Sequence, residues 1–333
     1  MLEEILVTAR HNAYIDPGLQ IWDWRISVYL FLGGLTAGIM FFSAWMLLAR
    51  KDEEAPFAVN RLALLAPVVL SVGMTTLFLD LSHKLYVWRF YTTFQPTSPM
   101  SYGAWILVLV YPITILQILS TLRQGYPGLA RPIDRLDVGR WLLDVIQSRR
   151  RLFAWLAIPT AVALGIYTGI LLSAFSARPF WNTGLLGILF LVSGLSTGAA
   201  LTALMARRHG EKRLFTLVDA GLIVLELGVV ALLLINLSTG PQQQLEALRH
   251  LIGGNYALIF WGVFVSVGLM LPLLLELVEL RMPLGKLAIL APVLVLLGGY
   301  VLRVIAVDLG QESTWTQYES EYNAQWLQRL DDE

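Results

Sequence analysis

The chain contains eight apolar runs that are each long enough to cross a lipid bilayer. A hydrocarbon core of about 30 Å requires roughly 20 residues of helix, and only helices or closed barrels satisfy every backbone hydrogen bond inside it. The sequence therefore predicts an all-α, polytopic membrane protein with eight transmembrane helices. The expected spans are 24–49, 60–82, 102–122, 152–175, 183–206, 215–238, 255–279 and 286–307.

The composition agrees with this fold class. Hydrophobic residues make up 56% of the chain and charged residues only 14%, which is untypical of a soluble domain. The formal net charge is zero, so we expect the lipid bilayer and no nucleic acid as a partner. The first apolar run is longer than the hydrophobic part of a signal peptide, and no basic region precedes it, so it is interpreted as a membrane span.

The loops on the two sides of the membrane differ in charge. Sixteen of the 24 lysines and arginines fall at the loops after the first, third, fifth and seventh spans. Positively charged short loops are retained in the cytoplasm. We therefore expect these four loops to be cytoplasmic and both termini to lie outside.

The composition also limits the redox groups that the chain itself can bind. It has no cysteine, so it can form no disulfide, no thiolate-ligated cluster and no covalent c-type haem. Of its four histidines only His83 falls near the end of a span, whereas a bis-histidine haem needs two imidazoles on facing helices. We expect no haem, no iron–sulfur cluster and no catalytic metal in this chain.

Short similarities divide the eight spans into two sets of four. The paired segments, in order, are 34–38 with 194–198, 79–82 with 235–238, and 165–167 with 298–300. This order predicts a parallel duplication, although small residues recur in any membrane helix and explain such matches without one. The expected parts are residues 1–122 with 152–175 as the first four-helix bundle, 123–151 as a cytoplasmic connection, 183–308 as the second bundle and 309–333 as an outer tail.

The connection contains a candidate amphipathic helix. Over residues 133–147 the apolar side chains of Ile133, Leu136, Leu143 and Ile146 recur roughly on one face. This pattern predicts an interfacial helix on the cytoplasmic surface. The alternative is a basic loop that only fixes the topology.

Five polar residues gather at the expected outer ends of the first bundle. Arg25 and Tyr29 begin the first span, Asp80 and His83 end the second, and Tyr167 lies in the outer half of the fourth. A cleft between apolar helices that holds a phenol, an imidazole and a carboxylate suits a quinone, whose ring oxygens need hydrogen-bond donors that also exchange protons. The alternative is that both tyrosines belong to an aromatic belt and that Asp80 pairs with Arg25 or His83.

Further ionisable residues fall in the second bundle. Arg303 is expected about one turn before the end of the eighth span. Toward the inner face lie four acids, Asp219, Glu226, Glu276 and Glu279. Glu226 has no basic neighbour one turn away, so it is either neutral or paired across helices. Asp219, Glu226 and Glu276 are candidates for a proton path, whereas Glu279 and Asp219 also fit as end-of-helix residues beside Arg281 and Arg213.

Six short strings, together reaching over most of the chain, carry a family resemblance. They are 29–38 (YLFLGGLTAG), 80–83 (DLSH), 98–105 (SPMSYGAW), 167–172 (YTGILL), 193–198 (SGLSTG) and 298–303 (GGYVLR). The first and third are the most specific. In these strings the chain resembles the NrfD/PsrC family, the membrane subunits of polysulfide-reductase-like respiratory complexes.

The resemblance implies a subunit of a quinone-linked oxidoreductase in a bacterial or archaeal cytoplasmic membrane. It would exchange electrons between menaquinone or ubiquinone and a ferredoxin-like iron–sulfur subunit, which connects to a molybdopterin catalytic subunit on the outer face. The family's quinone site lies near the outer face of the first bundle, and its helix-four tyrosine matches Tyr167. Some members have a histidine where this chain has Tyr29, so Asp80 and His83 are the expected proton donors.

Two other functions stay open on the residues alone. Duplicated bundles with buried carboxylates also describe secondary transporters, although no pair of spans is broken by Gly or Pro in corresponding positions. A purely structural anchor without a quinone site is the third possibility. The acidic tail, with Trp315, Tyr318, Tyr322 and Trp326, is expected to be either a docking surface for the outer partner or a solvated end.

Overall fold

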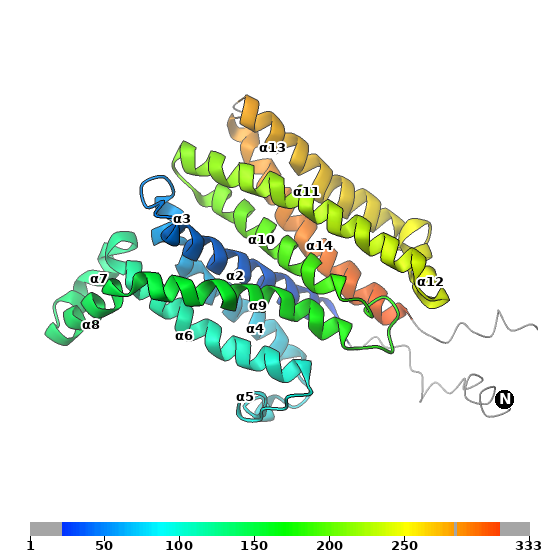
Figure 1. Cartoon of the computed structure of the whole chain (residues 1–333), viewed down its shortest axis with the longest axis horizontal. Helices are drawn as coiled ribbons and strands as arrows, with labels where there is room; N and C mark the ends of the chain where they lie inside the picture. The colour runs from blue at the N-terminus through cyan, green and yellow to red at the C-terminus, as the bar shows by residue number, and fades with distance from the viewer. Residues whose placement is uncertain (1–21, 283–284, 314–333) are drawn as a thin grey trace, which may run out of the picture.

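The computed structural model describes residues 22–282 and 285–313, and within these residues it is helical with no strand. Eight helices are long and apolar enough to cross a membrane, so the predicted fold class is confirmed (Figure 1). The spans are α2 (Trp24–Leu48), η1 with α4 (Leu62–Leu64, Leu65–Asp80), α6 (Pro99–Gly125), α9 (Arg150–Ser173), α10 (Leu185–Met205), α11 (His209–Thr239), η3 with α13 (Leu258–Met270, Leu271–Arg281) and η4 with α14 (Gly285–Ile289, Leu290–Glu312).

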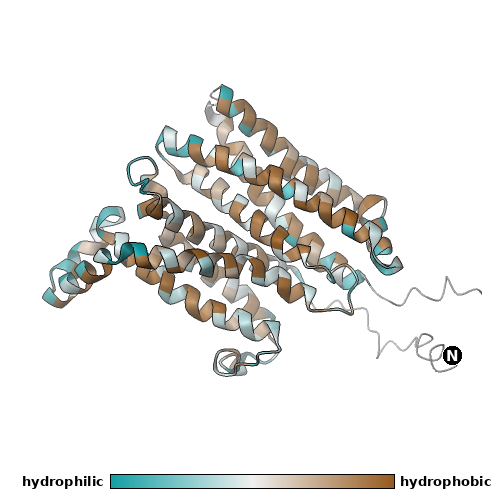
Figure 2. Ribbon diagram, viewed as in Figure 1, coloured by the Kyte–Doolittle hydropathy of each residue, from teal (hydrophilic) through white to brown (hydrophobic). Residues whose placement is uncertain are grey.

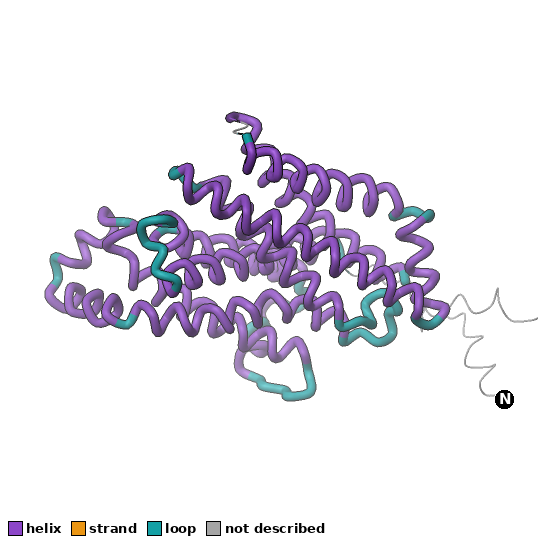
Figure 3. The backbone as a smooth tube through the Cα atoms, turned by 45° about the horizontal axis from the view of Figure 1, so that its top comes forward, coloured by secondary structure: helices purple, strands orange, loops and turns teal. Residues whose placement is uncertain are grey.

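The shorter helices lie in the connections between the spans. They are α3 (Pro56–Asn60), η2 (Lys84–Tyr86), α5 (Arg89–Thr92), α7 (Pro127–Asp134), α8 (Asp137–Ser148) and α12 (Gln242–Ile252). The loops gather at the ends of the long helices (Figure 3). We call the end with α5 and α12 the outer end and the end with α7 and α8 the inner end, following the predicted orientation.

The long helices pack in two groups that meet along α2 and α10. In the first group α2 contacts α4 and α9, and α6 contacts α9; in the second, α10 contacts α11 and α14, and η3 and α13 contact α14. Helix α2 is the most enclosed span, whereas the seventh span is the least buried and exposes mostly apolar side chains (Figure 2). This packing is compatible with the predicted pair of four-helix bundles, and the duplication stays a prediction.

The glycines of the first pair of similar segments lie against each other where α2 crosses α10. A Cβ atom added at Gly38 would come 2.9 Å from the Cα atom of Gly198, and one added at Gly194 would come 2.7 Å from the carbonyl oxygen of Gly34. Small residues allow this close approach of two membrane helices. The two groups are therefore joined by direct backbone contact.

This contact makes a stability prediction. Gly38→Ala should lower the free energy of unfolding by about 1–3 kcal/mol, because the added methyl group overlaps backbone that cannot move without separating the helices. The measurement is the thermal unfolding of the purified protein in detergent. Gly228→Ala on α11 is the matched control, since a Cβ there meets nothing within 4 Å. Equal melting temperatures for the two variants would contradict the close crossing.

Three spans are longer than predicted, and one of them is α6, which covers Pro99–Gly125 rather than 102–122. Helix α11 begins at His209 rather than at residue 215, and α14 continues to Glu312 rather than to residue 307. The first turn of α11 is polar and is stabilised by a tertiary contact. The buried carboxylate of Glu211 accepts a hydrogen bond from the backbone N–H of Ala58 at 2.8 Å. Hydropathy does not detect such tertiary contacts, so the predicted span for α11 begins too late.

The predicted single helix over 133–147 is wrong in its bounds. The chain forms α7 and α8 with a break at Arg135 and Leu136, and Leu136 is 67% exposed instead of facing the protein. Arg123 at the end of α6 donates hydrogen bonds to Asp134 at 2.6 Å and to Asp144 at 2.5 Å, which ties both short helices to the span. These hydrogen bonds lower the pKa of Asp134.

The seventh span contains a feature that was not predicted. Residues Leu258–Met270 are wound as a π-helix, which ends just before Pro272. Within it, the hydroxyl of Ser266 donates to the carbonyl oxygen of Trp261 at 2.7 Å. At the corresponding place in the first group, α6 is a continuous α-helix despite Pro112. Among the described spans only the seventh contains a π-helix, so they lack the matched pair of helices interrupted within the membrane that is typical of many transporters.

The predicted orientation can be tested because the chain has no native cysteine. Ser148 at the inner end and Asn255 at the outer end are both exposed. Single Ser148→Cys and Asn255→Cys variants should react with a membrane-impermeant maleimide from opposite faces of sealed vesicles, with Asn255→Cys labelled from the outside. Labelling of both variants from one face would contradict the eight-span topology, and labelling with the sides exchanged would contradict the orientation.

Candidate functional site

An apolar cavity opens between α2, α4, α6 and α9 near the outer end. Its volume is about 110 Å³, and its only polar wall groups are the hydroxyls of Tyr29, Tyr91 and Tyr167. A wider hollow of about 540 Å³ adjoins it at the outer face and is lined by His83, Arg89 and several hydroxyl groups. Three side chains, Leu81, Phe90 and Met100, line both spaces. The arrangement is a narrow apolar pocket beneath a polar mouth.

The tyrosines face the pocket and not the lipid. Tyr29 is 3% exposed and Tyr167 is 7% exposed, so the aromatic-belt interpretation is wrong for both residues. Their side chains are close enough to interact with each other. Tyr91 on α5 is the third phenol, and burial raises its pKa, so it stays a neutral hydrogen-bond donor at physiological pH. Tyr91 was not predicted, because the loop after the second span carries no periodic pattern.

Gly103 on α6 fixes the position of the Tyr167 ring. A Cβ atom added at Gly103 would overlap the ring and hydroxyl of Tyr167. The glycine therefore allows the ring to lie against the backbone of α6, and the next residue, Ala104, lines the same pocket. Both residues belong to the string 98–105 that carries the family resemblance, but their role becomes visible only when α6 and α9 are placed together.

Arg25 and Asp80 do not enter the pocket. Arg25 binds Asp23 at 2.7 Å and Asp80 at 3.5 Å, and it donates to the carbonyl oxygen of Leu79 at 2.9 Å. Asp80 is therefore paired with Arg25, as one of the two alternatives predicted. Helix α4 ends at Asp80 and the backbone of Leu81 is extended, which carries His83 away to the mouth. The expected convergence of all five residues is thus correct only for the two tyrosines, with His83 above them.

At the corresponding place, the second group of spans has a much smaller space. The cavity between α10, α11, η3 and α14 measures about 10 Å³ and is lined by apolar side chains, among them Leu189, Phe264 and Leu302. The ring of Tyr300 instead packs against Phe31 of α2, with 5.9 Å between ring centroids. The candidate quinone site is therefore confined to the first group.

A pair of buried acids joins α11 to α13. Asp219 is fully buried and accepts a hydrogen bond from the hydroxyl of Ser196 at 2.6 Å, and its carboxyl group interacts with that of Glu276. Apart from this interaction with each other, the second oxygen of Asp219 and both oxygens of Glu276 have no hydrogen-bond partner among the described residues. The end-of-helix interpretation of Asp219 is wrong, because α11 begins ten residues before it.

Glu226 and Arg303 are a second pair of buried ionisable residues. Both are buried and they attract each other, although they do not form a direct ion pair. Arg303 donates to the hydroxyl of Ser193 at 2.5 Å and to the carbonyl oxygen of Phe190 at 3.0 Å. The prediction that Arg303 lies one turn before the end of its helix is wrong, since α14 continues for nine more residues. Its guanidinium group lies beside Gly34 of α2.

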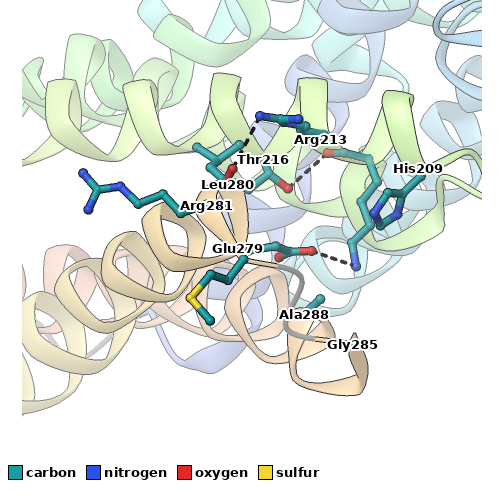
Figure 4. A pocket seen from close by; sticks show the side chains of 10 residues that line it. His209, Arg213, Thr216, Glu279, Leu280, Arg281, Gly285 and Ala288 are labelled. Atoms are coloured by element: carbon teal, nitrogen blue, oxygen red, sulfur yellow. Dashed lines mark hydrogen bonds and ion pairs between the residues drawn. The ribbon is translucent and has the colours of Figure 1, made fainter.

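An open cavity lies at the inner end, beside the start of α11 and the end of α13. It measures about 240 Å³ and is lined by basic side chains and Glu279, as Figure 4 shows. Glu279 binds Lys212 at 3.3 Å and not the predicted Arg281. Glu276 lies one turn deeper on the same helix. Within residues 22–282 and 285–313 no three histidine, aspartate or glutamate side chains group as candidate metal ligands.

These features define a class of protein, a multi-pass helical membrane protein with an apolar, phenol-lined pocket near one face and buried carboxyl groups behind the other. The family model described as "Polysulphide reductase, NrfD" matches residues 14–313 of the chain. The chain therefore belongs to the NrfD/polysulfide reductase family, as its resemblance predicted.

Named relatives agree with this assignment. Protein NrfD of Escherichia coli (strain K12) is 29% identical over 269 residues, which cover 77% of this chain and 84% of that protein. One of the polysulfide reductase chains of Wolinella succinogenes is 28% identical over 271 residues, covering 77% and 83%. One of the selenate reductase subunits of Mesobacillus selenatarsenatis is 26% identical over 282 residues, covering 76% and 66%. The family thus includes subunits of reductases with different substrates.

Proposed function

We propose that this chain is the quinone-interacting membrane subunit of a multisubunit respiratory oxidoreductase. The observation that carries the proposal is the pocket between α2, α4, α6 and α9, whose apolar wall is interrupted only by three phenols. An apolar cavity with a few convergent polar groups is the usual form of a small-molecule site. The pocket and the adjoining mouth share lining residues, so a quinone ring in the pocket would exchange protons with water through the mouth at the outer end.

The chemistry assigned to these residues is hydrogen bonding and proton exchange. Oxidation of a quinol to a quinone releases two electrons and two protons, and reduction takes them up. In the proposal Tyr167 and Tyr29 donate hydrogen bonds to a quinone oxygen, and the imidazole of His83 in the mouth exchanges protons with water. Asp80 and Arg25 hold the outer ends of α4 and α2 together and so fix the walls of the pocket.

The electrons must leave the chain through a partner. With no cysteine and four histidines, the chain has few ligands for a redox group of its own. The proposed acceptor is a ferredoxin-like iron–sulfur subunit at the outer end, connected to a molybdopterin catalytic subunit. The names of the reductase relatives support this assignment, and the direction of the pocket mouth agrees with it. The predicted tail is residues 309–333. Its first four residues continue α14, and the rest beyond residue 313, which includes its four aromatic residues, lies outside the described residues.

A proton path from the inner end is the second part of the proposal. Its support is the order of the groups. The cavity with Lys212 and Glu279 comes first, Glu276 and Asp219 come next, and Glu226 with Arg303 lies deepest. Two carboxyl groups that share a buried site exchange a proton readily, because they cannot both be charged at low cost. Arg303 reaches Gly34 on α2, the helix that also carries Tyr29.

The same acids first suggested a transporter. Membership in a family that includes reductase subunits and the single irregular span favour the oxidoreductase. A purely structural anchor would have no use for the phenol-lined pocket.

Filling the pocket tests the proposal. Ala104→Phe places a ring in the pocket and should remove quinone that co-purifies with the intact complex, measured by solvent extraction and mass spectrometry. Ala231→Phe, on the exposed face of α11, is the control for the added ring. The proposal fails if Ala104→Phe retains as much bound quinone as Ala231→Phe.

A further inference from the structure

Helix α8 has three distinct faces, and one of them is apolar but uncovered. Gly139, Leu143 and Ile146 face the protein, and the two larger side chains are buried. A polar face carries Asp137, Arg140, Asp144 and Gln147. The third face has apolar side chains at i, i+3, i+4 and i+7, the spacing of a continuous stripe on a helix. This stripe consists of Val138, Trp141, Leu142 and Val145.

The stripe is strongly exposed. Val138 is 76% exposed, Trp141 64% and Leu142 44%. Nothing in the part of the chain that the structure describes packs over them. Only Arg149 separates the end of α8 from the start of α9, so the stripe lies near the inner end of a membrane span. Figure 2 shows the hydrophobic and hydrophilic faces side by side on α7 and α8.

Unpaired positive charge flanks the stripe in the sequence. The nearby acids are already engaged, because Asp134 and Asp144 bind Arg123 and Asp137 lies 3.7 Å from Arg140. The guanidinium groups of four arginines make no hydrogen bond or ion pair with the described residues. They are Arg131, Arg135, Arg149 and Arg151. The segment therefore combines an apolar stripe with an excess of cations.

We propose that α8 is a binding surface for anionic lipid, with the stripe in the headgroup region of the inner leaflet and the four arginines against lipid phosphates. An amphipathic helix with tryptophan and leucine on one face and arginines beside it binds at the interface of an anionic membrane, and each arginine near the surface adds to the attraction. The proposal is independent of the quinone site, since it concerns the opposite end of the molecule.

A pair of adjacent cysteines tests it. Val138→Cys lies on the stripe and Asp137→Cys, one residue away, lies on the polar face, and both positions are exposed in the protein. The full-length, otherwise cysteine-free chain is labelled at either position with an environment-sensitive fluorophore and reconstituted into vesicles of phosphatidylcholine with or without phosphatidylglycerol. The expected result is a blue-shifted emission at Val138→Cys that is quenched by nitroxide-labelled lipid and protected from aqueous iodide. The label at Asp137→Cys should stay accessible to iodide.

The lipid composition and the arginines provide the decisive comparisons. The protection of the label at Val138→Cys from iodide should weaken when phosphatidylglycerol is left out. Arg131→Gln and Arg135→Gln, tested one at a time, should each lower the affinity of α8 for the anionic surface by about fivefold. Equal iodide access at both positions in both vesicles would overturn the proposal. Protection that depends on the protein-to-lipid ratio instead of phosphatidylglycerol would also overturn it, and would show that a second copy of the chain covers the stripe.

Discussion

Tyr167→Phe should reduce quinol-linked electron transfer by about 10²-fold or more, which is the usual cost of removing a group that hydrogen-bonds or exchanges protons at a reacting centre. The substitution removes one hydroxyl and retains the ring that fills the space against Gly103, so the packing of α6 against α9 should be preserved. The measurement is quinol-dependent reduction of the partner's iron–sulfur centres in the purified complex, followed by stopped-flow absorbance.

Tyr300→Phe is the matched control for this result. Tyr300 is a tyrosine of the eighth span whose ring packs on Phe31 and does not line the pocket. Removal of the Tyr300 hydroxyl should leave the rate of quinol-linked electron transfer nearly unchanged. If both variants assembled with the iron–sulfur subunit and Tyr167→Phe were as active as Tyr300→Phe, Tyr167 would have no part in quinone chemistry.

Glu226→Gln should separate proton movement from electron transfer. Glutamine retains the shape of the side chain but cannot carry the proton, so the number of protons taken up from the inner side per electron should fall toward zero. Electron transfer should change little in the absence of a membrane potential, because the quinone pocket lies in the other group of helices. The measurement is the number of protons taken up per electron by the complex in liposomes that contain a pH-sensitive dye.

Two controls belong to this experiment. Glu53→Gln changes an exposed acid of the inner loops and should leave the proton ratio unaltered. Thermal unfolding of Glu226→Gln shows whether Arg303, which loses its counter-charge, still holds α14 against Ser193 and Phe190. An unchanged proton ratio in a stable variant would remove Glu226 from the path.

The eight spans could be predicted from the sequence because hydropathy and length determine whether a helix crosses a bilayer. The ends of the spans could not. The polar start of α11 is stabilised by the contact of Glu211 with Ala58, residues far apart in the sequence. Because the predicted helices were too short, Asp219 and Arg303 were placed near helix ends, although both are buried in the structure.

Only part of the candidate site could be predicted, because the rest of it depends on contacts between distant residues. Tyr29 and Tyr167 could be named because polar residues in apolar helices are rare and the helix order brought them to one end. The separation of Arg25 and Asp80 from the pocket depends on the direction of side chains at the ends of α2 and α4, and the role of Gly103 depends on the approach of two backbones. Neither property is visible in a single sequence.

Photolabelling of the purified complex with an azidoquinone tests the central proposal most directly. The proposal predicts adducts in peptides 81–91 and 99–107, which line the pocket and its mouth, and loss of these adducts when excess unmodified quinone competes. Adducts that are confined to the second group of spans around Asn236 and Tyr300, or labelling that excess quinone does not reduce, would contradict a quinone site between α2, α4, α6 and α9.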